Sequence, residues 1–231
     1  MNQESPVPFP QGADSEMLDR LLRETFDFFR HEVNPQNGLV ADKTQPGSPS
    51  SIAAVGMGLS VYIVAVVRGL WSQREAIDRT LALLRFLKAS HQGPEPDATG
   101  YKGFYYHFID MQTGRRVSQS ELSTVDTAIL MAGILAVASY FAGNNPEESE
   151  IRKLAVELYR RVDWKWALNG GNTITHGWKP ESGFLRFRWD TGYSEAIILY
   201  VLALGSPTFP IIPPIVHWIV EVASQGRFGS R

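Results

Sequence analysis

Two carboxylates have sequence surroundings that suit proton transfer, and the first is Glu195. It follows the run Trp189-Asp190-Thr191-Gly192-Tyr193-Ser194 and falls in the first turn of a predicted helix. This places a carboxyl group at the mouth of a cleft, between the rings of Trp189 and Tyr193. Burial beside aromatic rings raises the pKa of a carboxyl group, as a general acid requires. The alternative is an acidic residue that only complements the positive end of the helix dipole.

Asp126 is the second candidate carboxylate. It lies one turn into a predicted helix that is otherwise apolar, where an unpaired charge is costly. Glu121 precedes it by five residues, and Ser123 and Thr124 supply hydroxyl groups beside it. The alternative is helix capping, because a serine followed three residues later by an acidic residue approximates a capping box.

Aromatic and polar residues in Gly-rich loops are candidates for ligand binding. The stretch from Gly103 to Asp110 (Gly-Phe-Tyr-Tyr-His-Phe-Ile-Asp) alternates sufficiently for a short strand. Aromatic faces beside polar groups suit sugar rings, although each ring could equally belong to the core. We expect His107 to orient a ligand hydroxyl, or to be buried and hydrogen-bonded, and not to act as a base. The candidate binding residues are Tyr105, His107, Asp110, Glu121, Trp178, Trp189 and Tyr193, with Tyr106 as a further aromatic platform.

Several other kinds of chemistry find no support. The sequence contains no cysteine, which excludes thiolate metal sites and a cysteine nucleophile. The five histidines show no paired spacing, so no metal site is expected. Phosphate loops, dinucleotide fingerprints and Gly-x-Ser-x-Gly elbows are lacking, so no cofactor is expected. A net charge of −2 gives no electrostatic argument for nucleic acid or an anionic membrane, and Arg115-Arg116 is predicted to be a solvated turn.

The elements that must position these residues are mostly helices. Long irregular segments at 91–120 and 169–190 separate helix pairs, and a short β-ribbon is predicted near 183–188. This order is typical of an α/α toroid, although periodicity alone indicates only a mostly α single domain. Residues 1–13 are predicted to be a loose lead-in, and 211–231 a divergent tail. The predicted helices span about 14–32, 51–70, 73–90, 120–141, 147–166, 193–204 and 213–223.

The uncharged stretch Ile52–Val67 raises the question of a membrane span. It is shorter than the roughly 20 residues that a span needs. Gly56 and Gly58 suit a buried helix packed closely on its neighbours, which is the prediction we favour. Because Met1-Asn2-Gln3-Glu4 does not begin a secretory signal, the default expectation is a cytoplasmic protein.

Four ordered motifs together resemble the glucoamylase-like domain family, which includes bacterial endo-β-1,2-glucanases and a domain of cyclic β-1,2-glucan synthases. The resemblance covers about residues 14–210 and concerns the amino-terminal part of the family domain. Phe209 departs from the polar residue usual at its position, and nothing after Pro210 resembles the family. The motifs are Ser51–Leu59, Gly103–Met111 with Thr113-Gly114-Arg115, Glu121–Ala128, and Gly192–Ala196 continuing to Thr208.

The resemblance implies a six-fold α/α barrel, incomplete here, with a sugar cleft at one mouth. It also implies hydrolysis of a β-glucan, with β-1,2-glucan favoured, by the paired carboxylates Glu195 and Asp126. Two alternatives remain open: a carbohydrate-binding or structural remnant without a complete catalytic pair, and a protein-interaction domain. An open toroid would expose inner helix faces, so self-association through the barrel edge is a further expectation.

Overall fold

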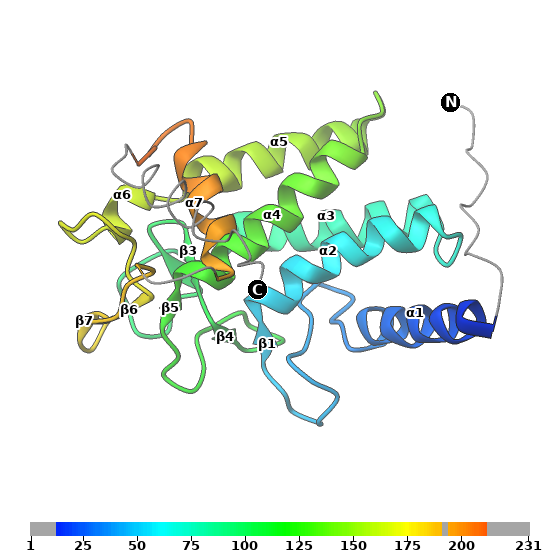
Figure 1. Cartoon of the computed structure of the whole chain (residues 1–231), viewed down its shortest axis with the longest axis horizontal. Coiled ribbons are helices and arrows are strands. Elements are labelled where there is room, and N and C mark those ends of the chain that lie inside the picture. The colour runs from blue at the N-terminus through cyan, green and yellow to red at the C-terminus, as the bar shows by residue number, and fades with distance from the viewer. Residues whose placement is uncertain (1–12, 191–193, 212–231) are drawn as a thin grey trace, which may run out of the picture.

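The computed structural model describes residues 13–190 and 194–211, which fold into a helix-rich unit with two small sheets (Figure 1). Six predicted helices are found close to their expected limits. The predicted helix at 213–223 lies outside the described residues, as do the first twelve residues and all of the predicted tail except Ile211. The helices of the described part are α1 (Ala13–His31), α2 (Ile52–Val67), α3 (Gln73–Ala89), α4 (Thr124–Tyr140), α5 (Pro146–Arg161), α6 (Trp164–Ala167) and α7 (Ala196–Leu204).

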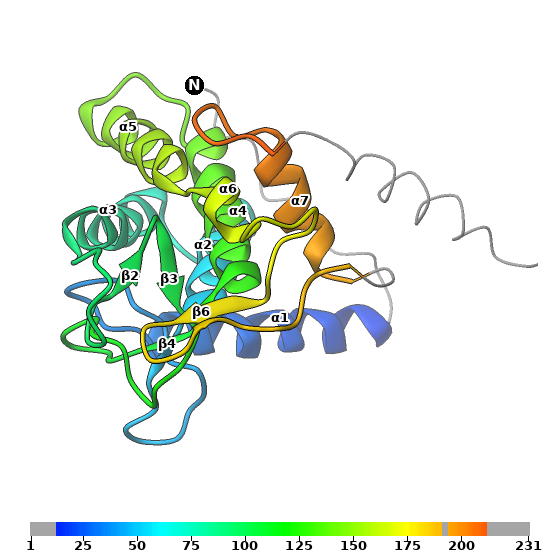
Figure 2. The same ribbon diagram turned by 90° about the vertical axis from the view of Figure 1, so that its left-hand side faces the viewer.

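The long helices form two rows. Helix α4 packs between α2 and α7, and we call these three helices the inner row. Helices α3 and α5 pack on each other and, through α2 and α4, cover one side of the inner row (Figure 2). Helix α1 packs beside α2. The chain therefore alternates between inner and outer helices, as in folds of the α/α-barrel type.

Local sequence signals start several of these helices. Ser72 begins α3 with a capping box, in which its hydroxyl accepts from the Glu75 amide while the Glu75 carboxylate accepts from the Ser72 amide. Asn145 caps α5 just before Pro146, a residue whose missing N–H costs nothing in the first turn. These ends are set by neighbouring residues, which explains why the sequence predicts them.

Helices α2 and α4 touch through glycine. A Cβ atom added to Gly56 would lie 2.6 Å from the Cα of Leu130, and one on Gly133 would collide with the carbonyl oxygen of Gly56. Their contact brings the two backbones closer than any side chain would permit. The glycines expected to favour close packing of Ile52–Val67 do so, and no helix of the described residues is long and apolar enough to cross a membrane.

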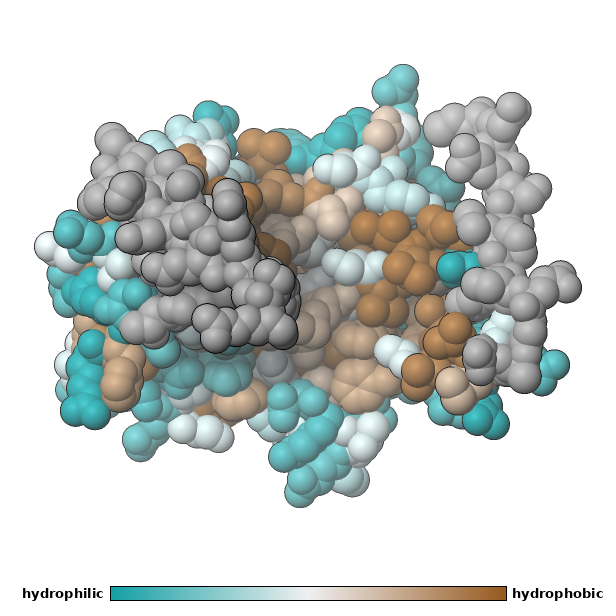
Figure 3. All heavy atoms as spheres, viewed as in Figure 1, coloured by the Kyte–Doolittle hydropathy of each residue, from teal (hydrophilic) through white to brown (hydrophobic). Residues whose placement is uncertain are grey.

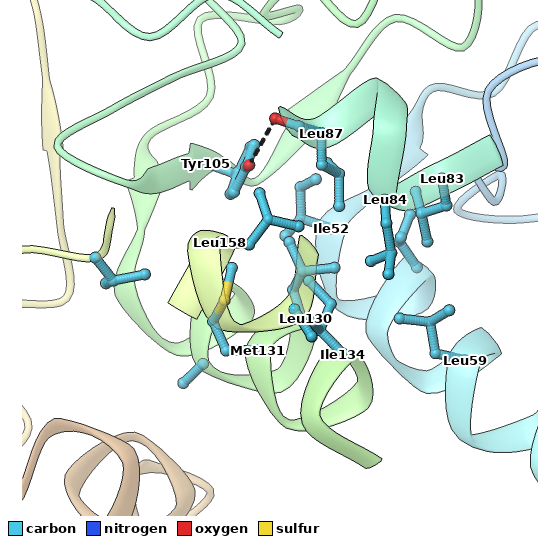
Figure 4. Close-up of a cluster of buried hydrophobic side chains, with 14 of the residues drawn as sticks. Ile52, Leu59, Leu83, Leu84, Leu87, Tyr105, Leu130, Met131, Ile134 and Leu158 are labelled. Carbon is cyan, nitrogen blue, oxygen red and sulfur yellow. Dashed lines mark hydrogen bonds between the residues drawn. The ribbon is translucent and has the colours of Figure 1, made fainter. Parts of the chain in front are cut away.

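The main core lies between the two helix rows (Figure 4). Leucine side chains of α3 meet Ile52 and Leu59 of α2 and Leu130 of α4, and all of them are buried. The hydroxyl of Tyr105 reaches this core and donates to the Leu87 carbonyl at 3.2 Å. Burying large apolar side chains stabilises each by about 1.5–3 kcal/mol, so this core is the principal support of the fold.

The irregular segments contribute strands to two antiparallel sheets. A two-residue strand, β1 (Ser50–Ser51), pairs with β4 (Phe108–Ile109). From the sequence we expect separate ribbons in each loop, whereas the structure joins strands from the segment before α4 and the segment before α7 into one sheet at one end of the helices (Figure 2). That five-stranded sheet has the order β2 (Gly100–Tyr101), β3 (Phe104–Tyr106), β5 (Leu122–Ser123), β6 (Gly177–Lys179) and β7 (Gly183–Phe184).

The predicted helix 147–166 is wrong in one respect, because the structure divides it. Helix α5 ends at Arg161, and a single turn, α6, begins at Trp164. Between them, Asp163 caps α6 by accepting from the Trp166 amide, and its own amide donates to the carbonyl of Lys102. This tie to a distant loop competes with continuation of the helix and ends it.

Candidate functional site

The sheets bring His107, Glu121 and Asp126 together, and we call these three residues the carboxylate cluster. The Nδ1 atom of His107 lies 3.0 Å from Oε1 of Glu121 and 3.7 Å from Oδ2 of Asp126. Backbone bonds fix the histidine, since its amide donates to the Glu121 carbonyl and its carbonyl accepts from Ile52. The ring of Phe108 stacks on the imidazole at 4.0 Å. Three sequence candidates thus meet beside the start of α4.

The two acidic partners favour the charged form of the imidazole. The hydrogen bond to Glu121 raises the pKa of His107 above its usual value, against the effect of burial, and the charges of Asp126, Glu121 and Asp42 add to the rise. The same hydrogen bond lowers the pKa of Glu121, and Lys179 contributes in that direction. The two carboxylates therefore favour the protonated imidazole, and the cluster contains both donors and acceptors for a ligand.

Of the capping box considered from the sequence for Ser123 and Asp126, the structure shows one hydrogen bond. The Ser123 hydroxyl accepts a hydrogen bond from the Asp126 amide at 3.3 Å, so Ser123 is the N-cap of α4. The Asp126 carboxylate lies 3.7 Å from the His107 ring nitrogen, and the side chain is 13% exposed. The Oδ2 atom of Asp126 is consequently directed toward the His107 ring.

Trp189 joins the start of α4 to α7. Its indole Nε1 donates to the Thr124 hydroxyl at 3.1 Å, and its carbonyl accepts from the Tyr200 hydroxyl of α7 at 2.6 Å. The His176 ring stacks against the indole with the centroids 3.8 Å apart. Thr124 donates in turn to the carbonyl of Thr175. This half-buried indole is held by one hydrogen bond and one stacked ring, and it lies next to the helix turn that carries Asp126.

Glu195 stands at the N-cap position of α7, and its side chain is exposed. The structure shows no capping hydrogen bond from this side chain, and its place at the start of α7 agrees with the alternative that it only complements the helix dipole. Within residues 13–190 and 194–211, no hydrogen bond or ion pair joins Glu195 to the carboxylate cluster. Tyr193, predicted to stack a sugar beside it, lies outside the described residues.

Tyr105 and Tyr106 are corrections to the predicted stacking platforms, since both side chains are fully buried. Tyr105 points into the main core, and Tyr106 lies beneath the guanidinium group of Arg116 at 4.8 Å from its ring centroid. Burial raises the pKa of Tyr106 to about 12. Strand β3 is covered on both faces, so its alternation does not present one face to a ligand.

Asp110 and Arg116 belong to the structure of a turn. The Oδ1 atom of Asp110 accepts from the amides of Gln112 and Thr113 and from the Thr113 hydroxyl, so this oxygen is occupied by the turn itself. The prediction of a solvated Arg115-Arg116 pair is half wrong. Arg115 is exposed, but the side chain of Arg116 is 2% exposed and pairs with Glu181 at 2.6 Å.

Trp178 packs beside two other aromatic rings. Its ring lies 5.4 Å from that of Tyr101 and 5.9 Å from that of Trp166, measured between centroids. It is half-buried and packs against the core, opposite Leu122 in the sheet. One part of the indole therefore supports the sheet, and the exposed remainder borders the strand that leads into Asp126.

The sequence analysis missed residues that contact or influence the site. His176 stacks on Trp189, Thr124 accepts from it, and Asp42 and Lys179 are near enough to shift pKa values in the carboxylate cluster. These contacts join positions up to 65 residues apart. The Thr124 hydroxyl was noted only as a polar neighbour of Asp126, and no spacing signal marks the other three.

Two other features of the described chain, possible metal-binding groups and a surface hollow, offer no alternative site. No group of three or more histidine and acidic side chains in residues 13–190 and 194–211 is arranged to hold a metal ion. A hollow of about 370 Å³ between α1 and α3, lined by residues such as Arg30, Trp71 and Arg79, contains none of the candidate residues. The chemistry-bearing side chains gather instead where the sheets meet α4.

Comparison with known proteins gives one match among characterised sequences that spans almost the whole chain. An exo β-1,2-glucooligosaccharide sophorohydrolase of Parabacteroides distasonis is 26% identical over 98% of this chain, which corresponds to 31% of that enzyme. No family model matches. The chain thus spans about a third of the length of this relative.

Two solved structures have the same fold over nearly all of the chain. A candidate glucoamylase of Bacteroides uniformis has a TM-score of 0.81 and 27% identity, covering 91% of this chain and 51% of that protein. An endo-β-1,2-glucanase of Chitinophaga pinensis, solved with sophorotriose and glucose, has a TM-score of 0.78 and 25% identity, covering 96% and 53%. These findings confirm the resemblance to the amino-terminal part of glucoamylase-like proteins.

Proposed function

We propose that this chain is the amino-terminal part of a glycoside hydrolase-like protein that acts on or binds a β-glucan, with β-1,2-glucan favoured. The observation that carries the proposal is Trp189, which connects the helix start bearing Asp126 to the helix bearing Glu195. The names of two similar proteins support the substrate class, since one is a β-1,2-glucooligosaccharide hydrolase and the other a β-1,2-glucanase solved with sophorotriose.

The proposed fold is half of a six-fold α/α barrel. The described helices make three outer and inner pairs, α1 with α2, α3 with α4, and α5 with α7. Three pairs are half of the six that close such a barrel. The coverage of 51% and 53% of the two solved relatives agrees with this proportion.

In the proposed reaction, Glu195 and Asp126 act on opposite sides of the glycosidic bond. Glu195 protonates the leaving oxygen, and Asp126 accepts a proton from the attacking water or attacks the anomeric carbon itself. A sugar lying over Glu195 would cover its exposed carboxyl group. His107 and Glu121 orient sugar hydroxyls and hold Asp126 in place, while Trp178, Trp189 and Tyr193 offer apolar faces to the rings.

A second candidate function is carbohydrate binding without hydrolysis. It is favoured by the exposed position of Glu195, whose side chain has no described contact that orients it toward Asp126. A general acid displaced by about 1 Å can lose on the order of 10²-fold in rate. Such a chain would retain the aromatic and cluster contacts to the sugar and lack turnover.

The deciding experiment is an assay of new reducing ends on linear β-1,2-glucan at high protein concentration. The proposal of an enzyme expects product with β-1,2-glucan, less with β-1,3-glucan, and none with the double variant Asp126→Asn, Glu195→Gln. Absence of product together with saturable glucan binding would select the binding function. Neither product nor binding would reject both functions.

A further inference from the structure

The sequence contains two Asn-Gly pairs, and the structure gives them opposite surroundings. They are Asn37-Gly38, in the loop after α1, and Asn169-Gly170, in the turn after α6. In any Asn-Gly pair, the glycine amide nitrogen can attack the side-chain carbonyl carbon of the asparagine, because glycine has no side chain to hinder the approach. The attack therefore depends on how firmly the fold holds the asparagine side chain and the glycine amide.

The Asn37-Gly38 pair is held at each group that such a reaction needs. The side-chain nitrogen of Asn37 donates to the Met111 carbonyl at 3.0 Å, and its side-chain oxygen accepts from the Leu39 amide at 3.0 Å. The Gly38 amide donates to the Asn34 carbonyl at 2.8 Å. Asn37 is only 7% exposed, and a Cβ atom added to Gly38 would collide with α3. Attack within this pair requires the local structure to open.

The Asn169-Gly170 pair lacks these constraints. Within residues 13–190 and 194–211, neither the Asn169 side chain nor the Gly170 amide forms a hydrogen bond, although the amides of Asn169 and Gly171 donate to the carbonyls of Trp166 and Leu168. Both residues of the pair are exposed, and a Cβ atom added to Gly170 would meet no atom within 4 Å. The turn lies at the loop end of the molecule, where α6 is seen in Figure 1 and hydrophilic residues lie at the surface in Figure 3.

We propose that Asn169 is a site of spontaneous deamidation. The Gly170 nitrogen loses its proton and bonds to Cγ of Asn169, which closes a succinimide ring. The bond from Cγ to the side-chain nitrogen breaks, and that nitrogen leaves as ammonia with the proton. Water then opens the ring at one of its two carbonyl groups. Opening at Cγ gives aspartate and opening at the main-chain carbonyl gives isoaspartate, so either product adds a negative charge.

The modified turn is bound by Arg188. Its Nη1 atom donates to the carbonyls of Leu168 and Thr173 at 3.0 and 2.6 Å, and its Nη2 atom donates to the Asn169 carbonyl at 3.4 Å. Isoaspartate adds a carbon atom to the main chain between the two carbonyls that Nη1 binds. Because Arg188 directly precedes Trp189, the modification changes charge and backbone length beside the candidate site.

The test is peptide mapping by mass spectrometry after prolonged incubation of the folded chain in mildly alkaline buffer. Trypsin places the two asparagines on different peptides, since Lys43 lies between them. The mass gain of an amide converted to a carboxyl group should accumulate at Asn169 at least about 10-fold faster than at Asn37, whose hydrogen bonds must break first. An isoaspartyl-specific methyltransferase should label the peptide that contains Asn169.

The controls separate the effect of the fold from that of the sequence. In urea, the rates at Asn169 and Asn37 should converge, because the two pairs contain the same reacting groups. Asn169→Gln should remove the acidic species that isoelectric focusing detects in the aged protein. Asn172→Gln is the matched control, since Asn172 is exposed in the same loop but precedes threonine, and it should leave that species unchanged.

Four results would overturn the proposal. These are equal rates at the two asparagines of the folded chain, faster modification of Asn37, an unmodified Asn169 under conditions in which the unfolded chain reacts, and an undiminished acidic species in Asn169→Gln. The inference does not rest on the proposed function. No readout involves a glucan, so its failure leaves that function to its own test.

Discussion

The starts of α4 and α7 carry the two candidate carboxylates in contrasting ways. At α4, the Ser123 hydroxyl accepts from the Asp126 amide, Thr124 is bonded to Trp189, and His107 lies 3.7 Å from the Asp126 carboxylate. At α7, Glu195 occupies the N-cap position, is exposed and forms no capping bond. The start of α4 is held by several polar contacts, whereas within residues 13–190 and 194–211 the Glu195 side chain forms no capping bond at the start of α7.

The two helix starts would serve the proposed reaction differently. Preorganised polar groups stabilise charge without reorganisation during the reaction, which fits the proposed role of Asp126. An exposed carboxylate is accessible to a sugar, which fits the proposed proton donor Glu195. The comparison therefore predicts that changes at α4 affect both folding and function, while changes at Glu195 affect function alone.

The largest expected effect is on turnover. Asp126→Asn and Glu195→Gln should each lower kcat on linear β-1,2-glucan by roughly 10²–10⁴-fold, the usual contribution of a general acid or base. The exposed carboxylate of Glu157 on α5 is paired with Lys88, and Glu157→Gln serves as the control that keeps full activity. A Glu195→Gln protein as active as the wild type would remove Glu195 from the reaction.

A smaller effect, on stability, is expected when the hydrogen bond between the Trp189 indole and the Thr124 hydroxyl is removed. Thr124→Val keeps the shape of the side chain but leaves the indole N–H without its acceptor, and a buried unpaired polar group costs about 1–3 kcal/mol. Urea denaturation measures the free energy of unfolding. Thr208→Val removes an exposed hydroxyl that donates to the Arg160 carbonyl, and it should lower the free energy of unfolding by less. Equal decreases for the two variants would contradict a stabilising role for the hydrogen bond between Trp189 and Thr124.

Capping provides a direct comparison of the two helix starts. Ser123→Ala removes the acceptor for the Asp126 amide and should lower the free energy of unfolding by about 1 kcal/mol. Glu195→Ala removes no capping bond, so its effect should remain within roughly 0.5 kcal/mol. Thermal or urea unfolding of both variants measures the two changes in the free energy of unfolding. A larger decrease for Glu195→Ala than for Ser123→Ala would contradict the expected difference between the two helix starts.

The smallest predicted effect is the pH dependence of the carboxylate cluster. The pKa of His107 is raised from 6.5, so its pairing stabilises the fold below that pH and is lost as pH rises through the raised value. The pKa of Glu121 is lowered from 4.5, so its contribution is lost only as pH falls through the lowered value. His107→Gln should therefore destabilise most between about pH 4.5 and 6.5 and least at high pH.

The matched control for this pH series is His31→Gln, at the exposed end of α1. Its difference from the wild type should not follow the His107 profile. A penalty for His107→Gln that grows toward alkaline pH would show that the imidazole is held neutral, contrary to its two acidic neighbours.

The helices were predictable because their determinants are local. Ser72 with Glu75 marks the start of α3, and Asn145 before Pro146 marks that of α5. The division at Asp163 was not predictable, because the amide that ends the longer helix bonds to Lys102, sixty-one residues earlier. Long-range bonds of this kind leave no periodic trace in the sequence.

The sequence allowed the residues of the candidate site to be chosen, but it did not allow their arrangement in space to be predicted fully. The sequence selected His107, Glu121 and Asp126, which the structure places together. It also selected Tyr105, which is buried, because alternation along a strand identifies two faces but not whether both are covered. The stacking of His176 on Trp189 depends on the antiparallel bridge between Thr175 and Arg188 within one loop, and no spacing signal in the sequence marks it.

The measurement that tests the central claim most directly is calorimetric titration of the protein with a β-1,2-linked glucose trisaccharide. The account predicts saturable binding by the wild type and at least a 10-fold weaker affinity for Trp189→Ala, with the folded state of the variant checked by circular dichroism. It also predicts that Glu195→Gln still binds the trisaccharide. Absence of binding by the wild type, or undiminished affinity in folded Trp189→Ala, would contradict a sugar site at the start of α4.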